Sequence, residues 1–222
     1  MVTNYTTPII IYIKALLLCL YTDRAWSPRS PKKQISTGFQ WFKHNISDHL
    51  PTTNGSPPPP TPSGWHKINV DTAFELDSAF SGIVLRNEHG TIIDAATNHN
   101  TCLDATTAEC IALWEACILI SNKKMANMIF ESDCLNAISF LIGEPKNCYW
   151  KVSLIIEQIR RIWTGWPSWI FKFTPRETNG AAHELAKWAQ INLFVGQVPL
   201  VSIPINVFCD QGFPIVNNFV IP

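Results

Sequence analysis

The chain has little charge and no excess of either sign. Its 222 residues carry 17 Lys and Arg against 17 Asp and Glu, and charged residues make up only 15% of the sequence. The first 60 residues hold a basic surplus, whereas residues 61–195 hold more acidic than basic side chains. Nucleic-acid binding through overall positive charge therefore finds no support, and any polyanion must be held by a local patch or by metal ions.

The sequence also lacks the cysteine patterns of disulfide frameworks and zinc sites. Its seven cysteines are an odd number, and no two of them form a CxxC pair. This usage is typical of free, mostly buried thiols in a reducing compartment. The cysteines are Cys19, Cys102, Cys110, Cys117, Cys134, Cys148 and Cys209.

No hydrophobic run is long enough for a clear membrane span. The most apolar segment, PIIIYIKALLLCLY at residues 8–21, contains Lys14 and has no charged region before it. We expect a frayed amphipathic helix or the remnant of an upstream domain, with membrane or secretory targeting as the alternative and no firm membrane partner. A nuclear or cytoplasmic location is expected, although the only basic signal is the weak stretch RSPKK near Pro31.

Composition divides the chain into four parts. A hydrophobic content of 46% is enough for a sizeable core, but the segment PTTNGSPPPPTPSG cannot enter one, because its prolines favour extended, solvated backbone. We therefore predict an apolar, irregular N-terminal extension at 1–50, a Pro-rich linker at 51–64, a folded domain at 65–195 and an apolar C-terminal tail at 196–222. The tail is either an extended strap packed along the domain or a truncated or misjoined end.

A regular order of strand and helix patterns fills the folded domain. The segments HKINVDTAF, SGIVLRNEHG and TIIDAATNHN alternate like strands and predict an antiparallel meander. A helix from Ala105 to about Ser121 leads to the strand NMIFESD, whose crossover connection implies parallel pairing with the first strand. The pattern predicts an α/β fold: a mixed five-stranded sheet of three antiparallel strands followed by parallel strands, with helices on both faces. The remaining segments are the helices CLNAISFLI and YWKVSLIIEQIRRIW, the strand WIFKFTP and the last helix NGAAHELAKWAQINLF.

Three acidic residues lie where predicted strands and helices begin or end. Asp71 follows INV in the first strand, Glu109 lies in the first turn of the first helix, and Asp133 ends NMIFESD. Converging carboxylates repel one another unless cations lie between them, so the arrangement predicts a divalent-metal site. Each residue also has a plainer explanation: Asp71 could cap a strand end, Glu109 could favour the helix dipole, and Asp133 could be the N-cap of the next helix.

Several ordered motifs resemble those of a known family. The runs WHKINVDTAF, GIVLRNEHG, TTAECIALWEA, IFESDCLNAISFL and PRETNGAAHELAKWA resemble the type 1 ribonuclease H domain, in the reverse-transcriptase-like version found in plant proteins related to retroelements. The resemblance implies a ribonuclease H-like fold, an endonuclease that hydrolyses the RNA strand of RNA–DNA hybrids, and Mg²⁺ as cofactor, with Mn²⁺ as an alternative. Such hydrolysis uses two divalent ions about 3.5–4 Å apart, and Asp71, Glu109 and Asp133 are the implied ligands.

One position departs from the bacterial pattern of this family, in which a fourth catalytic aspartate precedes Glu-Leu-Ala. His183 stands there in this chain. The helix dipole disfavours its protonated form, so we expect a neutral imidazole that ligates metal or orients a water and count His183 among the catalytic and metal-binding residues. A surface or capping histidine is the alternative. Arg176 is either a phosphate contact or a solvated loop charge, and Asn179 is expected to cap the last helix and to contact the substrate backbone.

Three functions follow from this sequence. The first is a metal-dependent endoribonuclease that acts by a two-metal mechanism on RNA–DNA hybrids, with activity weakened by His183. The second is a catalytically weak or inactive module, derived from a retroelement, that binds nucleic acid or protein. The third is a DNA-cutting or strand-joining enzyme on the same fold, which is disfavoured because those enzymes place the last acid on a later helix. For the first function we expect a monomer that binds hybrids through their shape, without sequence specificity.

Overall fold

The computed structural model of the chain describes residues 61–143, 148, 150–204 and 207. The predicted extension at 1–50, the apolar segment within it and most of the predicted linker lie outside these residues. None of the described helices is both long enough and apolar enough to cross a membrane. The described cysteines are all free thiols, and Cys102, Cys110 and Cys117 are buried.

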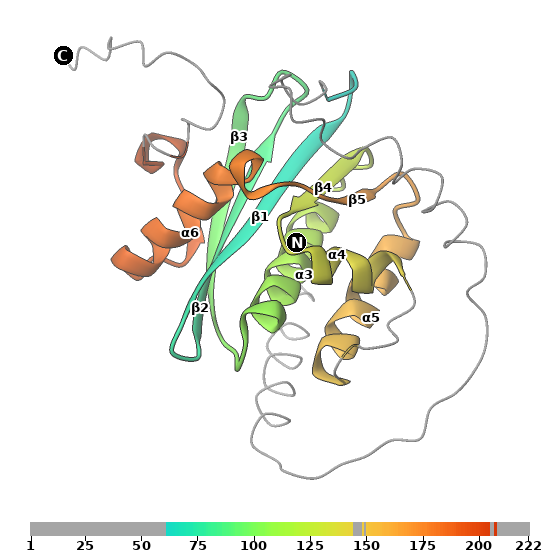
Figure 1. Cartoon of the computed structure of the whole chain (residues 1–222). Helices are drawn as coiled ribbons and strands as arrows, with labels where there is room; N and C mark the ends of the chain where they lie inside the picture. Colours follow the sequence, from blue (N-terminus) through green and yellow to red (C-terminus); the bar gives the residue numbers. More distant parts are fainter. Residues whose placement is uncertain (1–60, 144–147, 149, 205–206, 208–222) are drawn as a thin grey trace, which may run out of the picture. The chain divides into compact units, whose positions relative to one another are not determined.

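Three antiparallel strands open the fold (Figure 1). They are β1 (His66–Glu75), β2 (Ser78–Arg86) and β3 (Ile92–Thr101). The β1–β2 connection has two residues, Leu76 and Asp77, and both have positive φ angles of 47° and 64°. Two-residue hairpins favour this backbone because its twist matches that of the strands. The predicted meander is confirmed, although β2 begins three residues earlier than its sequence pattern.

Helices and two further strands follow in the predicted order. Helix α3 (Ala105–Asn122) leads to strand β4 (Met128–Ser132), which pairs in parallel with β1. A second parallel pair joins β4 to the edge strand β5 (Ile170–Phe173). The intervening and final helices are α4 (Leu135–Ile142), α5 (Trp150–Thr164), the short η1 (Arg176–Thr178) and α6 (Gly180–Asn192).

The sheet has six strands in the order β5-β4-β1-β2-β3-β6, one more than the five predicted. The additional strand, β6 (Gly196–Gln197), has two residues and pairs antiparallel with Ala96 and Thr97 of β3. A strand of this length is too short for a period-two pattern, so it has no signal in the sequence. The mixed α/β fold itself is as predicted.

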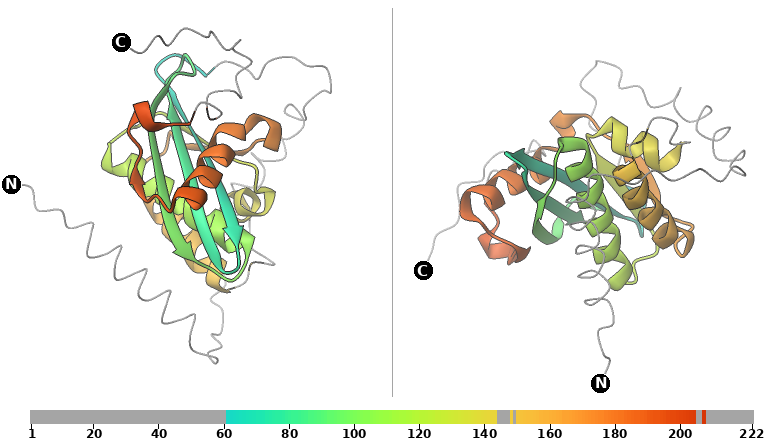
Figure 2. Two further views of the ribbon diagram at one scale, coloured as in Figure 1. Left: turned by 90° about the vertical axis from the view of Figure 1, so that its left-hand side faces the viewer. Right: turned by 90° about the horizontal axis from the view of Figure 1, so that it is seen from below.

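Helices cover both faces of the sheet, as Figure 2 shows, with α6 on one face and α3 and α5 on the other. Helix α6 lies unusually close to β2 at Gly82. A Cβ atom on Gly82 would lie 2.2 Å from the carbonyl oxygen of Ala182 and 2.6 Å from the backbone nitrogen of Ala186. Only glycine permits this approach, and it brings the first turn of α6 against the middle of β1 and β2.

The folded part of the chain continues past residue 195, where the sequence patterns end the domain. After β6 and the short helix η2 (Leu200–Ser202), Val198, Ile203 and Val207 belong to the buried cluster between α6 and the sheet. Their partners in this cluster include Leu185 of α6 and Val84 of β2. Residues 196–204 and 207 therefore pack along the domain, as expected for a strap.

Candidate metal centre

Asp71 is buried in the middle of β1, on the face that α6 covers. Only 1% of its surface is exposed, and Gly82 stands opposite it on β2. Its Oδ2 atom lies 2.7 Å from Nδ1 of His183 in α6. Since a carboxylate oxygen only accepts hydrogen bonds when ionised, the imidazole Nδ1–H donates to it. The close approach at Gly82 is what brings these two side chains into contact.

Glu109 points from α3 toward the same place. It lies in the second turn of the helix, not in the first turn as predicted, and Asp104 is the N-cap, accepting a 2.8 Å hydrogen bond from the backbone nitrogen of Thr107. The helix-dipole explanation for Glu109 therefore loses its basis. The hydroxyl of Thr72 donates to Glu109 Oε1 over 2.6 Å, whereas Oε2 is buried with no hydrogen-bond partner in the described part of the chain.

Asp133 lies directly after β4 and before α4. Cys134 holds the N-cap position of α4, and no side chain caps that helix, so the capping explanation for Asp133 is not seen. Its Oδ1 accepts a 3.2 Å hydrogen bond from the amide of Asn179, and its Oδ2 lies 3.3 Å from the guanidinium of Arg176.

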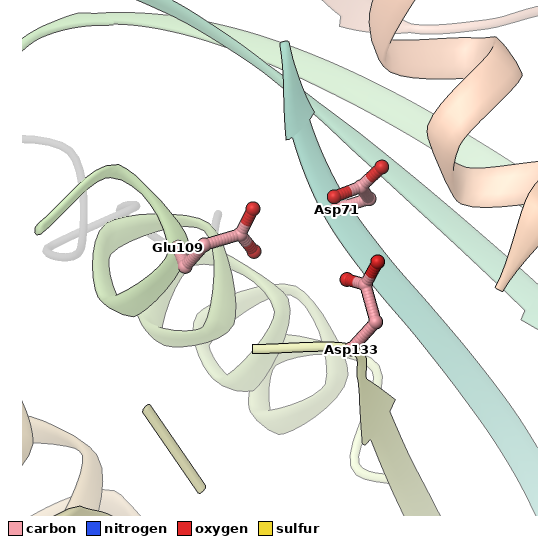
Figure 3. A group of neighbouring side chains, drawn as sticks. All are labelled: Asp71, Glu109 and Asp133. Atoms are coloured by element: carbon pink, nitrogen blue, oxygen red, sulfur yellow. The ribbon is translucent and has the colours of Figure 1, made fainter. Parts of the chain in front are cut away.

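The three carboxylates converge in space, as Figure 3 shows. One oxygen from each of Asp71, Glu109 and Asp133 lies within 4.8 Å of the others. Burial, the charge of Asp71 and the charge of Asp133 raise the pKa of Glu109 well above its ordinary value, and the Thr72 hydrogen bond opposes them only in part. Burial and Asp71 also raise the pKa of Asp133, against the opposing effects of Arg176 and Asn179. The cluster is therefore electrostatically unfavourable when fully ionised.

These residues fit a divalent cation. The cluster offers only carboxylate oxygens, which are the ligands that Mg²⁺ and Mn²⁺ prefer. Glu109 Oε2 is a buried carboxyl oxygen without a donor, and ionising such a group is costly unless a cation or a hydrogen bond compensates it. The protein chain places it beside two further acids and supplies no compensating group in the described residues.

His183 and Arg176 lie beside the cluster without belonging to it. His183 does not join the three acids in the group of potential ligands, and its role as a metal ligand stays a prediction. With Nδ1 donating to Asp71, the Nε2 atom accepts from Arg176 over 3.1 Å. The side chain of Arg176 is 62% exposed and also pairs with Asp133. It therefore lies at the solvent side of the acids.

Asn179 holds the predicted helix-cap position, but its side chain has other partners. It stands at the N-cap position of α6, but its side chain makes no capping hydrogen bond. The residue has no exposed surface, and its contact with the substrate backbone stays a prediction. Its amide nitrogen donates instead to Asp133 and, over 3.0 Å, to the carbonyl oxygen of Val70.

Sequence reasoning missed three residues that support the site. Thr72 donates a hydrogen bond to Glu109. The buried Asn69 and Glu131 are joined by a 2.9 Å hydrogen bond, and Asn69 also bonds to Asn179, the donor to Asp133. Burial alone would raise the pKa of Glu131, but the charges of Lys172 and Lys67 hold it below the ordinary value. A usable signal was the period-two alternation of β1, which puts Asn69 and Asp71 on one face.

Several solved structures similar to this chain are ribonucleases H. Ribonuclease H1 of the halophilic archaeon Halobacterium salinarum matches with a TM-score of 0.54 and 22% identity, over 57% of this chain and 98% of that chain. The LC11 ribonuclease H1 isolated from compost by a metagenomic approach matches with a TM-score of 0.53 and 21% identity, over 59% and 99%. The same enzyme in complex with an RNA/DNA hybrid gives a TM-score of 0.52 and 20% identity, over 58% and 99%. At identities this low, the structural likeness establishes the fold alone.

A comparison with curated proteins found no match. Among protein families, the model of the family described as reverse transcriptase-like matches residues 69–189, which include all three carboxylates and His183. This match confirms the resemblance seen in the sequence. The chain therefore belongs to the reverse transcriptase-like family, and its folded unit is a type 1 ribonuclease H domain.

Proposed function

We propose that this protein is a divalent-metal-dependent endoribonuclease that hydrolyses the RNA strand of RNA–DNA hybrids. One observation carries the proposal: Asp71, Glu109 and Asp133 converge within 4.8 Å, and one buried oxygen of Glu109 lacks a donor in the described part of the chain. Membership of the reverse transcriptase-like family supports it. So does the fold shared with LC11 ribonuclease H1, a protein whose structure contains an RNA/DNA hybrid.

The proposed metal is Mg²⁺, with Mn²⁺ as a substitute. When bound, a pair of such ions activates a water and stabilises the leaving oxygen of a phosphodiester. The three carboxylates would hold the ions, with Thr72 fixing one oxygen of Glu109 and leaving the other free for ligation. His183 holds Asp71 through Nδ1, which restricts the rotation of that carboxylate.

Arg176 is the proposed phosphate contact of the site. Its side chain is 62% exposed and lies at the solvent side of Asp133. A guanidinium has the donor geometry that phosphate oxygens favour. The chain has no net charge, so binding depends on local contacts of this kind and on the shape of the hybrid, including its 2′-hydroxyls. We therefore propose recognition without base specificity.

A second function is favoured by the surroundings of the acids. His183 stands where a further carboxylate would add negative charge, and Arg176 already pairs with Asp133. Both features reduce the negative charge available to cations. A domain that binds nucleic acid without cutting it is the second candidate on this observation.

Cleavage of a labelled RNA–DNA hybrid by the full-length protein tests the proposal. The assay is run in Mg²⁺, in Mn²⁺ and in EDTA, with the variant Asp71→Asn. Asp77→Asn is the matched control, because Asp77 is exposed and has a positive φ of 64°, which asparagine tolerates. We expect metal-dependent cleavage that Asp71→Asn lowers at least about a hundredfold, since a removed ligand costs several kcal/mol of transition-state stabilisation. Asp77→Asn should retain wild-type activity.

Two results would count against an enzyme. One is hybrid binding by the wild-type protein with no cleavage in either metal, which supports the second candidate. The other is cleavage that survives Asp71→Asn unchanged, because a contaminating nuclease or another site would then be responsible.

A further inference from the structure

A row of buried polar side chains runs from β4, next to the edge strand β5, to the carboxylates. It begins with Glu131 of β4, continues through Asn69 of β1 and ends with Asn179 at the start of α6. Glu131 and Asn69 are each 4% exposed, and Asn179 is fully buried. Buried polar groups in this number are costly unless all of them are paired, so the pairing pattern is informative.

Two lysines fix one end of this row. Lys67 Nζ lies 3.2 Å and Lys172 Nζ 2.8 Å from the same oxygen of Glu131, Oε1. Ammonium groups only donate hydrogen bonds, so Oε1 must be an acceptor. The second oxygen, Oε2, faces Asn69 and accepts a 2.9 Å hydrogen bond from its amide nitrogen.

The orientation of each amide follows from its neighbour. The amide nitrogen of Asn69 donates both to Glu131 and, over 3.2 Å, to Oδ1 of Asn179. The NH₂ group of Asn179 must then face the other way, toward the carbonyl oxygen of Val70 at 3.0 Å and Oδ1 of Asp133 at 3.2 Å. Both ends of the row are acceptors only, so a single donor direction satisfies every bond.

We propose that Glu131 is a positioning residue for the metal centre, which acts through Asn69 and Asn179 to keep a hydrogen-bond donor directed at Asp133. Glu131 itself bonds to Asn69, Lys67 and Lys172 and reaches Asp133 through the two asparagines. The inference rests on the proposed function, because it concerns a ligand of the proposed metal. Residues that orient a metal ligand typically change metal affinity by about 10–100-fold when they are removed.

Replacement of Glu131 by glutamine tests the donor direction with almost no change of shape. The two lysines still require an oxygen on their side, which leaves the new NH₂ group facing the NH₂ group of Asn69. Two donors cannot bond. If Asn69 turns over to accept, Asn179 must turn over as well, and an oxygen then faces Asp133. In either case the donor to Asp133 is lost or weakened.

The experiment measures Mn²⁺ binding to the full-length protein by calorimetry, together with the side-chain amide signals of Asn69 and Asn179 by NMR. Glu131→Gln should weaken Mn²⁺ binding about tenfold or more and shift the Asn179 amide signals. The matched control is Glu115→Gln, the same change at another buried glutamate. Glu115 lies on α3, away from Asp133, and accepts hydrogen bonds from Ser81 and Asn100. The control should change affinity less than about twofold.

A rescue separates donor direction from simple structural support. In the triple variant Glu131→Gln, Lys67→Met, Lys172→Met, no lysine competes for the glutamine oxygen, which can turn to accept from Asn69. We expect this variant to recover most of the affinity lost by Glu131→Gln. If Glu131→Gln alone fails to fold, as judged by urea unfolding, the comparison of the triple variant with wild type still decides the matter.

Each outcome bears on one proposal or on both. Unchanged Mn²⁺ affinity in Glu131→Gln, or a folded triple variant that binds no better than the single one, would overturn the positioning role alone. A wild-type protein that binds no Mn²⁺ would overturn the proposed function and this inference with it. Hybrid cleavage, measured in parallel, should fall with the affinity and return with it.

Discussion

At the scale of single residues, a few hydrogen-bond donors offset part of the repulsion among the three acids of the site. Thr72 donates to Glu109 and Asn179 donates to Asp133, yet the pKa of both acids lies above its ordinary value because burial and Asp71 outweigh these contacts. The folded protein therefore binds protons at these positions more tightly than the unfolded chain does. A cation relieves the same repulsion as a proton, so metal and protons compete for the cluster.

In the metal-free protein, the repulsion among these acids should lower the stability of the fold as the pH rises. A carboxyl group whose pKa is raised on folding is neutral in both states at low pH and costs stability once folding must accommodate its charge. For Glu109 the loss begins as the pH rises above the ordinary value of 4.5 and grows until the raised folded pKa is passed. In EDTA, the unfolding free energy of Glu109→Gln minus that of wild type should therefore increase with pH, by about 1.4 kcal/mol for each unit of pKa shift.

Urea unfolding at several pH values measures this difference. Glu157→Gln is the control, since its side chain is 52% exposed and pairs with Arg161 of the same helix. This surface substitution should change stability by no more than about 0.5 kcal/mol. Added Mg²⁺ should stabilise wild type more than Glu109→Gln. If the unfolding free-energy difference between Glu109→Gln and wild type did not change with pH, the charge of Glu109 would not destabilise the folded protein.

The acids could be found from the sequence because each one interrupts an apolar pattern locally. Asp71 follows a buried run of β1, and Asp133 comes directly after another, the strand β4. Their supports could not be found in this way. Asn69 and Glu131 acquire their roles from the parallel register of β1 with β4, in which they stand opposite each other. That register is a long-range property that no local pattern contains.

At the scale of secondary-structure elements, the contact between α6 and β2 decides whether the site is complete. Helix α6 carries His183 and begins directly after Asn179, so both groups reach Asp71 and Asp133 only when the helix lies close to the sheet. Gly82 permits that distance because backbone atoms of α6 occupy the space of a side chain.

Gly82→Ala should therefore damage both the fold and the site. A methyl group within 2.2 Å of a backbone oxygen forces the helix away from the strand, and overpacking of this kind costs about 1–3 kcal/mol. Metal affinity should fall more than in a variant of equal stability, because Asn179 and His183 move with the helix. Thermal unfolding and Mn²⁺ calorimetry measure the two effects.

Gly165→Ala is the control for this prediction. Gly165 is exposed, and its nearest neighbour, the carbonyl oxygen of Ile162, would lie 3.4 Å from the new atom. The change in stability should stay within about 0.5 kcal/mol. Equal behaviour of the two alanine variants would show that the close approach at Gly82 has no consequence.

The long elements were predictable from sequence, within one to three residues at most ends. Helix α5 and strand β4 show clear periodicity or a continuous apolar run. Strand β6 was not predictable, because its partner Thr97 lies about a hundred residues earlier and its own two residues, Gly196 and Gln197, have no strand preference.

At the scale of the whole molecule, the described part of the tail belongs to the core. Strand β6 extends the sheet beyond β3, and the backbone nitrogen of Val198 donates to the carbonyl oxygen of Ala95 over 2.8 Å. Ile203 and Val207 then join the buried cluster that α6 forms with the sheet. A protein shortened to the predicted domain end at 195 would lack these residues.

The double variant Val198→Ala, Ile203→Ala tests this role in the full-length protein. Both side chains are buried in the cluster with α6, and each truncation should cost about 1–4 kcal/mol through lost burial and a residual cavity. Val201→Ala is the control, because Val201 is 97% exposed. Chemical denaturation should show a large loss for the double variant and almost none for the control. A chain that ends at residue 195 should lose at least as much.

The position of α6 near the end of the fold has a consequence for biosynthesis. Translation produces Asp71, Glu109 and Asp133 well before Asn179 and His183, the groups at the start of α6 that donate to two of them. A ribosome-bound chain that stops short of α6 thus holds the three acids without the hydrogen-bond donors that Asn179 and His183 supply. The complete centre, with these donors in place, can therefore form only after the last helix has left the ribosome.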